Sequence, residues 1–275
     1  VDAPVEEAPQ MLCTYEGVLD AYHNGLDVPE DVTLMWSDDK HGHTRNLCNP
    51  EERKRKGGAG IYYHLSYHGD PASWIWLSPL SPAFISTELT KAYTFGARKI
   101  WVFNVGDIKP AEKELSFAME LAWDIDRWKP ENAHNYIEQW ASRIFGKKAG
   151  KEIADIQKIY YHLMASGKDS HVYFIDYTTG DIVRRLEEYK DIEERALTLA
   201  SKIEESLLPA YFELVLYPVR GASLLNRYQL LARRSLANVG IDDRAAMEDA
   251  RMAEEAYHEL NEWTRLYNKE LLGGK

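Results

Sequence analysis

Three short apolar runs, each followed by polar residues, constrain the first half of this sequence most. They lie at residues 32–36, 61–66 and 99–104, and helical patterns follow at 84–95 and 113–123. Nearly continuous apolar runs are typical of strands buried on both faces, and strands that alternate with helices predict a parallel α/β fold. Because the carboxyl ends of parallel strands meet at one edge of a sheet, we expect the functional site there.

From residue 130 the pattern becomes helical. Apolar residues recur every three or four positions in three stripes: Ile153, Ile156, Tyr160 and Leu163; then Leu199, Ile203, Leu207, Tyr211 and Val215; then Ala250, Ala253, Tyr257, Leu260, Thr264, Tyr267 and Leu271. Each stripe must bury its face against a partner, so an all-α bundle is expected over residues 130–275.

Other element boundaries are predicted from local signals. Residues 5–26 are expected to form one helix that stops at Asn24-Gly25. Pro218 and Gly221 are expected to break the long helical region after residue 216. Residues 172–177 fit a short strand or an extended linker.

Composition excludes several classes of protein. The 275 residues include 33 Lys and Arg but 44 Asp and Glu, a net charge of −11, so nucleic-acid binding is not expected. No run of about 18 apolar residues exists, so no membrane span is expected. Cys13 and Cys48 are too few for a disulfide framework and are expected to be free thiols.

The number of predicted strands is too small for a complete barrel. Three strands cannot close a (β/α)₈ barrel, so we expect a piece of a longer protein.

Carboxylates near the strand ends are the catalytic candidates. Asp38 and Asp39 end the first apolar run, and paired carboxylates can divide acid and base roles, although a turn or helix-cap role is the alternative. Asp107 lies in the loop after the third run, where it either reaches a ligand or caps the turn. Glu88, near the start of a predicted helix, is stabilised there by the helix dipole whether or not it is catalytic.

Further side chains are candidates for binding a substrate. Tyr67 and His68 follow the second run, and His64 lies near its end. Asn104 ends the third run, and Trp74 either stacks on a sugar ring or packs under its loop. His41-x-His43 has weak metal-ligand spacing without supporting Cys or carboxylate ligands, so neither a metal site nor a cofactor is expected.

Taken together, these segments resemble glycoside hydrolase family 115, the xylan α-1,2-glucuronidases. The resemblance is carried by DVPEDVTLMWSDDKHGHTRNL, EERKRKGGAGIYYHLSYHGDP and AYTFGARKIWVFNVGDIKPAE, and it continues through PAYFELVLYPV and LYNKELLGGK. It implies that residues 1–129 are the C-terminal portion of a (β/α)₈ TIM-type catalytic barrel and that residues 130–275 are the helical bundle domain. Two departures are Lys40, where many relatives have Asn, and the absence of an aromatic residue just before Glu88.

The resemblance also implies an activity. Family 115 enzymes remove glucuronic acid or 4-O-methylglucuronic acid from xylan with inversion, which requires one acid and one base. It carries Asp38, Asp39, Asn104 and Asp107 into the site, and Arg45 is the best cation for the anionic sugar. Glucuronoxylan is the expected partner, and the piece alone is expected to be inactive. The full-length protein is expected to form a homodimer and to be secreted or periplasmic. The alternatives are a non-catalytic carbohydrate-binding or scaffold module and a metal-dependent barrel hydrolase.

Overall fold

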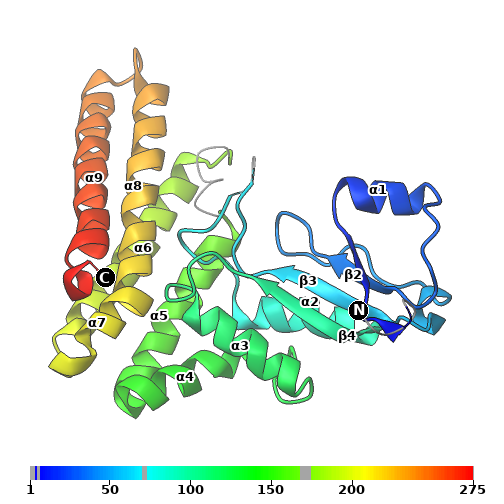
Figure 1. Ribbon diagram of the computed structural model, residues 1–275. Coiled ribbons are helices and arrows are strands. Elements are labelled where there is room, and N and C mark those ends of the chain that lie inside the picture. Colours follow the sequence, from blue (N-terminus) through cyan, green and yellow to red (C-terminus); the bar gives the residue numbers. More distant parts are fainter. Residues whose placement is uncertain (1–3, 5–6, 70–72, 168–174, 275) are drawn as a thin grey trace. The chain divides into compact units, whose positions relative to one another are not determined.

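The computed structural model describes residues 4, 7–69, 73–167 and 175–274. The chain divides into two units, coloured blue to green and green to red in Figure 1. The first unit is Val1–Ile75 with Leu80–His134, and the second is Trp76–Pro79 with Asn135–Lys275. A parallel sheet and many helices confirm the prediction of a mixed fold with an α/β part.

The first unit is built on a parallel sheet. Its described strands are β1 (Met11–Thr14), β2 (Thr33–Ser37), β3 (Ala59–His64) and β4 (Ala97–Asn104). They are hydrogen-bonded in the order β1-β2-β3-β4, and each pair is parallel. The three predicted strands are therefore confirmed to within two residues, and all strand carboxyl ends lie along one edge.

The prediction of one helix over residues 5–26 is wrong. Met11–Thr14 is β1, paired with β2, and only Gly17–His23 is helical (α1). The neglected signal is Pro9, which breaks a helix interior because it lacks an N–H donor and its ring clashes with the preceding turn. The sheet consequently has a fourth described strand, whose carboxyl end joins the same edge.

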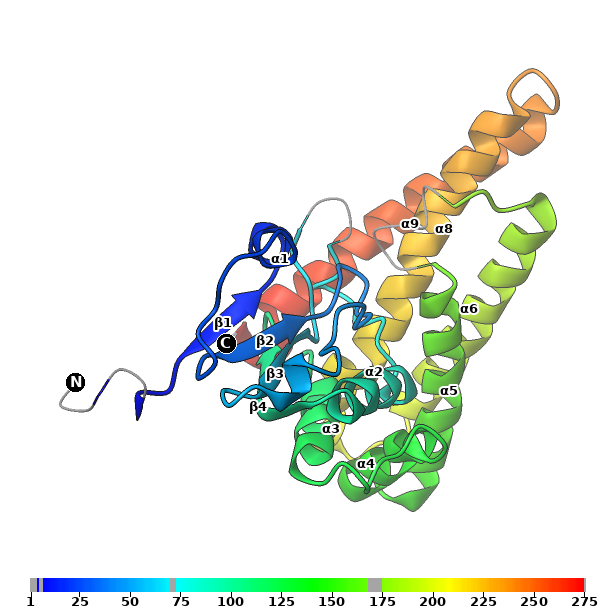
Figure 2. The same ribbon diagram turned by 90° about the vertical axis from the view of Figure 1, so that its right-hand side faces the viewer.

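Helices α2 (Pro82–Thr94) and α3 (Glu112–Trp123) match their predicted positions and pack together on one face of the sheet (Figure 2). Ser81 caps α2 by accepting a hydrogen bond from Phe84 N at 3.2 Å, and Pro82 fits the first turn. After α2 the chain turns at Gly96, whose φ of 103° favours glycine. The core beneath these helices includes fully buried Leu34, Ile61, Ile85, Leu89, Phe117 and Leu121.

The contact between β3 and β4 requires glycine at position 60. A Cβ atom there would lie 2.3 Å from the carbonyl oxygen of Ile100, and the strand register shifts between Ala59 and Ile61. The irregularity bends this part of the sheet. It thereby influences where His64 and Asn104, which pair at the carboxyl ends of the two strands, direct their side chains.

The second unit is helical over most of its described length. Its α-helices are α4 (Tyr136–Phe145), α5 (Lys147–Ala165), α6 (Thr179–Ala200), α7 (Leu208–Tyr211), α8 (Tyr217–Asn238) and α9 (Asp243–Lys269). Long helices α8 and α9 lie side by side, and α6 contacts both α5 and α8 (Figure 1). The segment Trp76–Pro79 belongs here because Trp76 Nε1 donates to Tyr217 Oη at 2.8 Å and Tyr160 Oη donates to Ser78 O at 3.1 Å.

The first predicted helical stripe is confirmed, since Ile153, Ile156, Tyr160 and Leu163 are all buried in α5. The second is not one helix. α6 ends at Ala200, a 3₁₀ turn covers Glu205–Leu207, and the π-helical turn Phe212–Leu216 precedes α8. The predicted break after residue 216 is also wrong. Pro218 lies in the first turn of α8, where no N–H is required, and Gly221 is buried within that helix.

The third stripe is confirmed only in part. Ala253 and Leu260 are buried in α9 as predicted, but Ala250 and Tyr257 are exposed, and the buried face extends to Ala256 and Trp263. The buried face also contains Asp249, whose carboxylate pairs with the Arg234 guanidinium at 2.6 Å. A pattern of apolar residues cannot identify a face that includes an acid. The predicted strand or linker over 172–177 lies partly outside the described residues.

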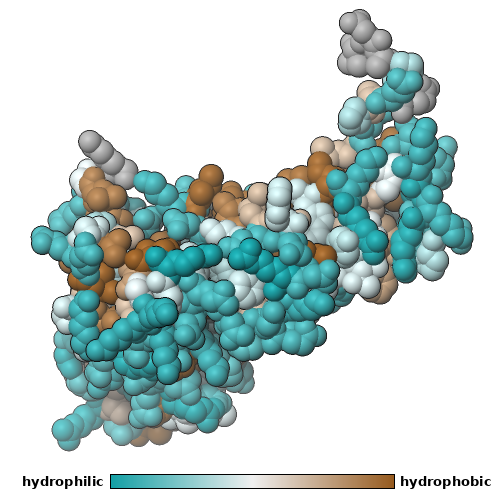
Figure 3. All heavy atoms as spheres, turned by 90° about the horizontal axis from the view of Figure 1, so that it is seen from below, coloured by the Kyte–Doolittle hydropathy of each residue, from teal (hydrophilic) through white to brown (hydrophobic). Residues whose placement is uncertain are grey.

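Hydrophilic side chains cover most of the surface seen in Figure 3, with separate hydrophobic groups among them. Within the described ranges, no helix combines the length and apolar character needed to cross a bilayer. Cys13 and Cys48 are free thiols, as predicted. Cys48 is buried, and Trp36 Nε1 donates to its sulfur at 3.0 Å.

Candidate active site

The carboxyl ends of the four strands bring several predicted residues to one edge of the sheet. Ser37 is in register with Tyr62, and His64 is in register with Asn104. Asp38 and Asp39 directly follow β2. We call this edge the rim, defined by Glu16, Asp38, Asp39, His64, Asn104 and Asp107.

Asp38 and His64 form a buried pair at the rim. Oδ1 of Asp38 lies 2.7 Å from His64 Nδ1 and accepts the His64 backbone N–H at 3.1 Å. Oδ2 is buried, with no hydrogen-bond partner among the described atoms. Burial raises the pKa of Asp38 above its ordinary value, although the bonds from His64 act in the opposite direction. The pair fixes the His64 ring and holds Asp38 away from solvent, since only 3% of the residue is exposed.

Asp39 has the opposite environment. Its Oδ1 accepts hydrogen bonds from the backbone N–H groups of His41 at 2.8 Å and His43 at 2.9 Å, and Arg45 Nε donates to Oδ2. Burial opposes ionisation, but Arg45 and these backbone donors outweigh it, so the pKa of Asp39 lies below its ordinary value. The side chain stays 22% exposed. An ionised carboxylate is thus held in a fixed position within reach of solvent.

Glu88 reaches the same loop from helix α2. Its Oε2 accepts the backbone N–H and the hydroxyl of Thr44, both at 2.7 Å, and lies 2.6 Å from Lys91 Nζ. Oε1 is 3.3 Å from His43 Nδ1. Burial opposes ionisation, but Lys91 and Thr44 outweigh it and hold the pKa of Glu88 below its ordinary value. The side chain is only 7% exposed.

The loop residues after β3 and β4 differ in how they are held. Asn104 donates through Nδ2 to Tyr62 Oη, so its side chain is fixed at the rim. Asp107 and His68 are exposed. Their side chains face solvent and are free to meet a ligand.

Tyr67 and Trp74 belong to a packed aromatic group. Tyr67 shares a hydrogen bond of 2.9 Å with Tyr15 through the two hydroxyls, and its ring lies 5.0 Å from that of His64. Trp74 is 1% exposed, and its Nε1 donates to Lys40 O at 2.8 Å. Here Trp74 packs beneath its loop and supports the backbone beside Asp39, and its ring is not open to a sugar.

Glu16 is a rim residue that the sequence reasoning missed. It follows β1 and has φ 47° and ψ −122°, a conformation that is strained for any residue with a side chain. The side chain is 59% exposed, and Oε1 lies 3.9 Å from Lys40 Nζ. Such strain concentrates at functional sites. The prediction of a helix over residues 5–26 concealed this carboxylate at the end of β1.

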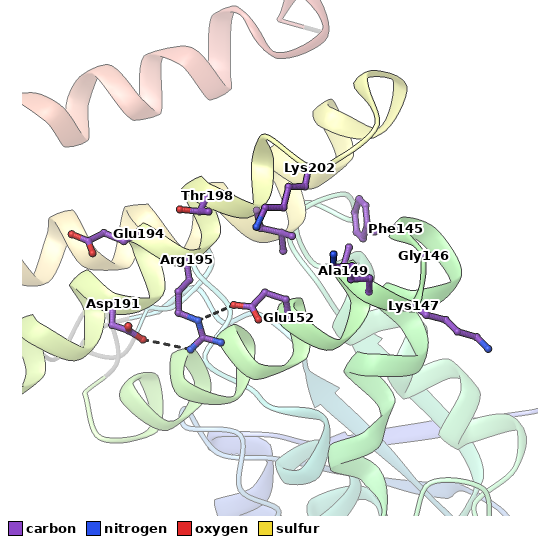
Figure 4. Close-up of a pocket in the computed structure, with 12 residues that line it drawn as sticks. Phe145, Gly146, Lys147, Ala149, Glu152, Asp191, Glu194, Arg195, Thr198 and Lys202 are labelled. Atoms are coloured by element: carbon purple, nitrogen blue, oxygen red, sulfur yellow. Dashed lines mark hydrogen bonds and ion pairs between the residues drawn. The ribbon is translucent and has the colours of Figure 1, made fainter.

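A separate cavity of about 800 Å³ lies in the second unit, between the start of α5 and the end of α6 (Figure 4). Its charges are partly neutralised, because Arg195 pairs with Glu152 at 2.8 Å and with Asp191 at 3.4 Å. Lys147 points away from that group in Figure 4. None of the predicted site residues lines it. We therefore place the candidate active site at the rim, where strained and fixed carboxylates gather.

Across the described residues, no group of three or more His, Cys, Asp or Glu side chains is arranged to hold a metal ion. His43, one of the two histidines considered for metal binding, instead approaches Glu88, and its ring packs edge-to-face with Phe84 at a centroid distance of 4.9 Å.

Comparisons with known proteins identify a family and a similar solved structure. No curated protein sequence matches the chain. A solved structure, described as the family GH115 4-O-methyl-α-glucuronidase BtGH115A with specificity for decorated arabinogalactans, matches with a TM-score of 0.90 and 36% sequence identity. The match covers 98% of this chain but 37% of that one. The family model for glycosyl hydrolase family 115 matches residues 1–171. Since this match spans well over half of the 275 residues, the chain belongs to glycosyl hydrolase family 115.

Proposed function

We propose that this chain is part of an enzyme that removes glucuronic acid or 4-O-methylglucuronic acid side chains from xylan with inversion. The observation that carries the proposal is the ionised, partly exposed Asp39 at the end of β2, in a member of a glycoside hydrolase family. Residues 1–129 would be the C-terminal portion of a (β/α)₈ barrel, and residues 130–275 a helical bundle domain. The order β1-β2-β3-β4 supports the barrel, because consecutive parallel neighbours characterise that fold.

Asp39 suits the role of the catalytic base. Inverting hydrolysis needs a carboxylate that takes a proton from water while the water attacks the anomeric carbon. A carboxyl whose pKa is held low by Arg45 stays ionised at neutral pH, so it can orient and polarise that water but is a poor proton donor. Asp38 suits this role less, because it is buried against His64.

The acid must be a second carboxyl group, roughly 6.5 to 9.5 Å from the base in inverting enzymes. Glu16 is our candidate, because it stands at the end of the strand next to β2, is exposed, and has strained backbone geometry. Asp107 is the alternative, from the far side of the rim. Asp38 and Glu88 are better suited to holding neighbouring groups, since both are buried and hydrogen-bonded.

Substrate contacts would come from the open side chains around the rim. Arg45 is 66% exposed beyond its bond to Asp39, so its remaining N–H groups can bind a uronate carboxylate. Asn104, His68 and Asp107 can meet sugar hydroxyls. His64, Tyr67 and Trp74 would support this surface from beneath.

A second candidate substrate is a decorated arabinogalactan, favoured by the specificity named for BtGH115A. The two substrates share the uronic acid cap and differ in the polymer behind it. A non-catalytic carbohydrate-binding module is the alternative from another class, and it would bind the same sugars without releasing them.

The test uses the full-length protein that contains this sequence. It is incubated with glucuronoxylan and with decorated arabinogalactan, and proton NMR follows the released uronic acid and its initial anomeric form. We expect release of the β-anomer from an α-linked side chain, and xylan as the better substrate. Release with retained configuration would refute the mechanism, and faster release from arabinogalactan would reverse the substrate assignment. Binding without release would favour the non-catalytic module.

A further inference from the structure

Thr44 occupies a central place in the loop that holds Asp39. The residue before it, His43, donates its backbone N–H to Asp39 Oδ1 at 2.9 Å, and the residue after it, Arg45, donates to Oδ2. The loop is closed further by Asp39 N donating to His43 O at 2.9 Å and Gly42 N donating to Asp39 O at 3.2 Å. Any displacement of Thr44 therefore moves two of the groups that surround the Asp39 carboxylate.

Glu88 fixes Thr44 from outside the loop. The two bonds of 2.7 Å to Glu88 Oε2, from the Thr44 backbone N–H and hydroxyl, join residues 44 positions apart in the sequence. Both Thr44 and Glu88 are buried, at 3% and 5% exposure, so water does not compete effectively for these bonds. Lys91, one turn further along α2, holds the same oxygen at 2.6 Å.

Glu88 is poorly placed to exchange protons with a substrate. Both of its carboxylate oxygens have protein partners, and its side chain lies inside the fold beneath the loop. A proton donor needs access to the glycosidic oxygen. These contacts indicate that Glu88 acts through the residue it binds, Thr44.

We propose that Glu88 is a positioning residue, which anchors Thr44 and thereby keeps the His43 N–H and the Arg45 guanidinium on Asp39. The inference rests on the proposed function only for its catalytic consequence. The charged and titratable groups near Glu88 are Lys91, His43, Arg45 and Tyr63. Those near Asp39 are Arg45 and Tyr63, together with the loop amides. Asp38 is the nearest residue along the chain, and it is turned toward His64.

The first test measures the loop without requiring activity. Hydrogen–deuterium exchange by mass spectrometry is followed in the full-length protein for the peptide that spans residues 39–45. Thr44→Val removes the hydroxyl bond with little change of shape, and Glu88→Ala removes the anchor. We expect about tenfold faster exchange in this peptide for both variants, because the amides of His41, His43 and Thr44 lose protection.

Thr87→Val is the matched control. Thr87 neighbours Glu88 on α2, but its hydroxyl donates to Ala83 O at 2.8 Å within the helix and does not contact the loop. Exchange in the 39–45 peptide should be unchanged in this variant. Unchanged exchange in Thr44→Val and Glu88→Ala would overturn the proposal, whatever the activity of the protein.

The second test connects the anchor to catalysis through the pH profile of kcat/KM. Weaker hydrogen bonds to Asp39 destabilise its ionised form and raise its pKa. The acidic side of the kcat/KM profile should therefore move upward by roughly 0.5 to 1 pH unit in Thr44→Val and stay in place in Thr87→Val.

A lower melting point with an unchanged acidic side of the profile would mean that Glu88 has a purely structural role, and it would overturn the proposal. A loss of about 100-fold in Glu88→Gln with normal Thr44→Val would also overturn it, because Glu88 would then carry the proton itself. A wild-type protein without activity would refute the proposed function, while the exchange result would still decide on the anchor.

Discussion

Each unit of the chain contains a charged side chain that a dense network of hydrogen bonds surrounds. In the first unit the charge is the Asp39 carboxylate, which receives two backbone N–H groups and the Arg45 guanidinium. In the second it is the Arg185 guanidinium, which donates to Asn226 Oδ1 at 2.7 Å and to the carbonyl oxygens of Leu163 and Gly167, both at 2.9 Å. Similar bonding thus surrounds an anion in one unit and a cation in the other.

The two networks differ in how far solvent reaches the central charge and in the charge of its partners. Asp39 keeps 22% of its side chain exposed and has a cationic partner, so its charge is stabilised where a ligand can reach it. Arg185 is 5% exposed, and the partners named above are neutral. It joins α6 to the carbonyl groups at the end of α5, where the helix dipole favours a cation. We infer that the first network serves chemistry and the second serves folding.

The largest effect predicted from this comparison is on stability. Arg185→Leu should lower the free energy of unfolding of the full-length protein by about 3 kcal/mol, because buried carbonyl groups lose their donors. Urea denaturation measures it. Arg184→Leu is the control, since Arg184 is 68% exposed and pairs with Asp181 at the surface, and it should change stability by less than about 0.5 kcal/mol. Equal losses in the two variants would contradict the structural role of Arg185.

Asp39→Asn tests the other side of the comparison. If Asp39 is the base, turnover should fall by about 100-fold or more while the melting point changes little. The assay is initial-rate release of uronic acid, with Asp20→Asn as the control because Asp20 is an exposed carboxylate on α1. A full loss of activity that coincides with a collapsed melting transition would favour a turn-holding role for Asp39. If Asp39→Asn keeps wild-type turnover, the rim is not the active site.

A smaller effect is expected from Glu88 as the pH changes. Its pKa is lower in the folded state than the ordinary value near 4.3, so its ionised form stabilises the fold above that pH. This stabilisation is lost as the pH falls through the lower, folded pKa. Glu88→Gln should therefore reduce stability by about 1 kcal/mol at pH 6, and the difference from the wild type should shrink below pH 4. A difference that grew on acidification would contradict the sign of the shift.

Sequence patterns predicted those parts of the molecule whose signals are local. The strands at 33–37, 59–64 and 97–104 were found because each contains a nearly continuous apolar run, and α2 because its end at Gly96 is marked. Asp38 and Asp39 were recognised together, but consecutive residues at a strand end point in opposite directions. One therefore meets His64 inside, and the other meets Arg45 at the surface.

The rest depended on contacts that a single sequence does not display. Glu88 was considered a catalytic candidate, yet its principal partner is Thr44, and no periodicity links two positions so far apart. Asp249 is similarly buried on α9, where it pairs with Arg234, and a pattern of apolar residues does not reveal such a contact. Glu16 was missed for a local reason, because a four-residue strand carries little signal once a longer helix has been assigned across it.

The smallest effect should come from Asp107, the predicted catalytic residue that lies most open to solvent. It is exposed in the loop after β4, whereas Asp39 is held by three donors. Electrostatic catalysis depends on groups that are oriented before the reaction, so a carboxylate on an open loop contributes less than a fixed one. We expect Asp107→Asn to lower turnover by no more than about fivefold and stability by less than about 0.5 kcal/mol.

Glu16→Gln, assayed beside Asp107→Asn, should lower turnover by about 100-fold if Glu16 is the acid. If Asp107→Asn shows the larger loss with an unchanged melting point, the acid comes from β4 and not from β1, and the strain at Glu16 needs another explanation.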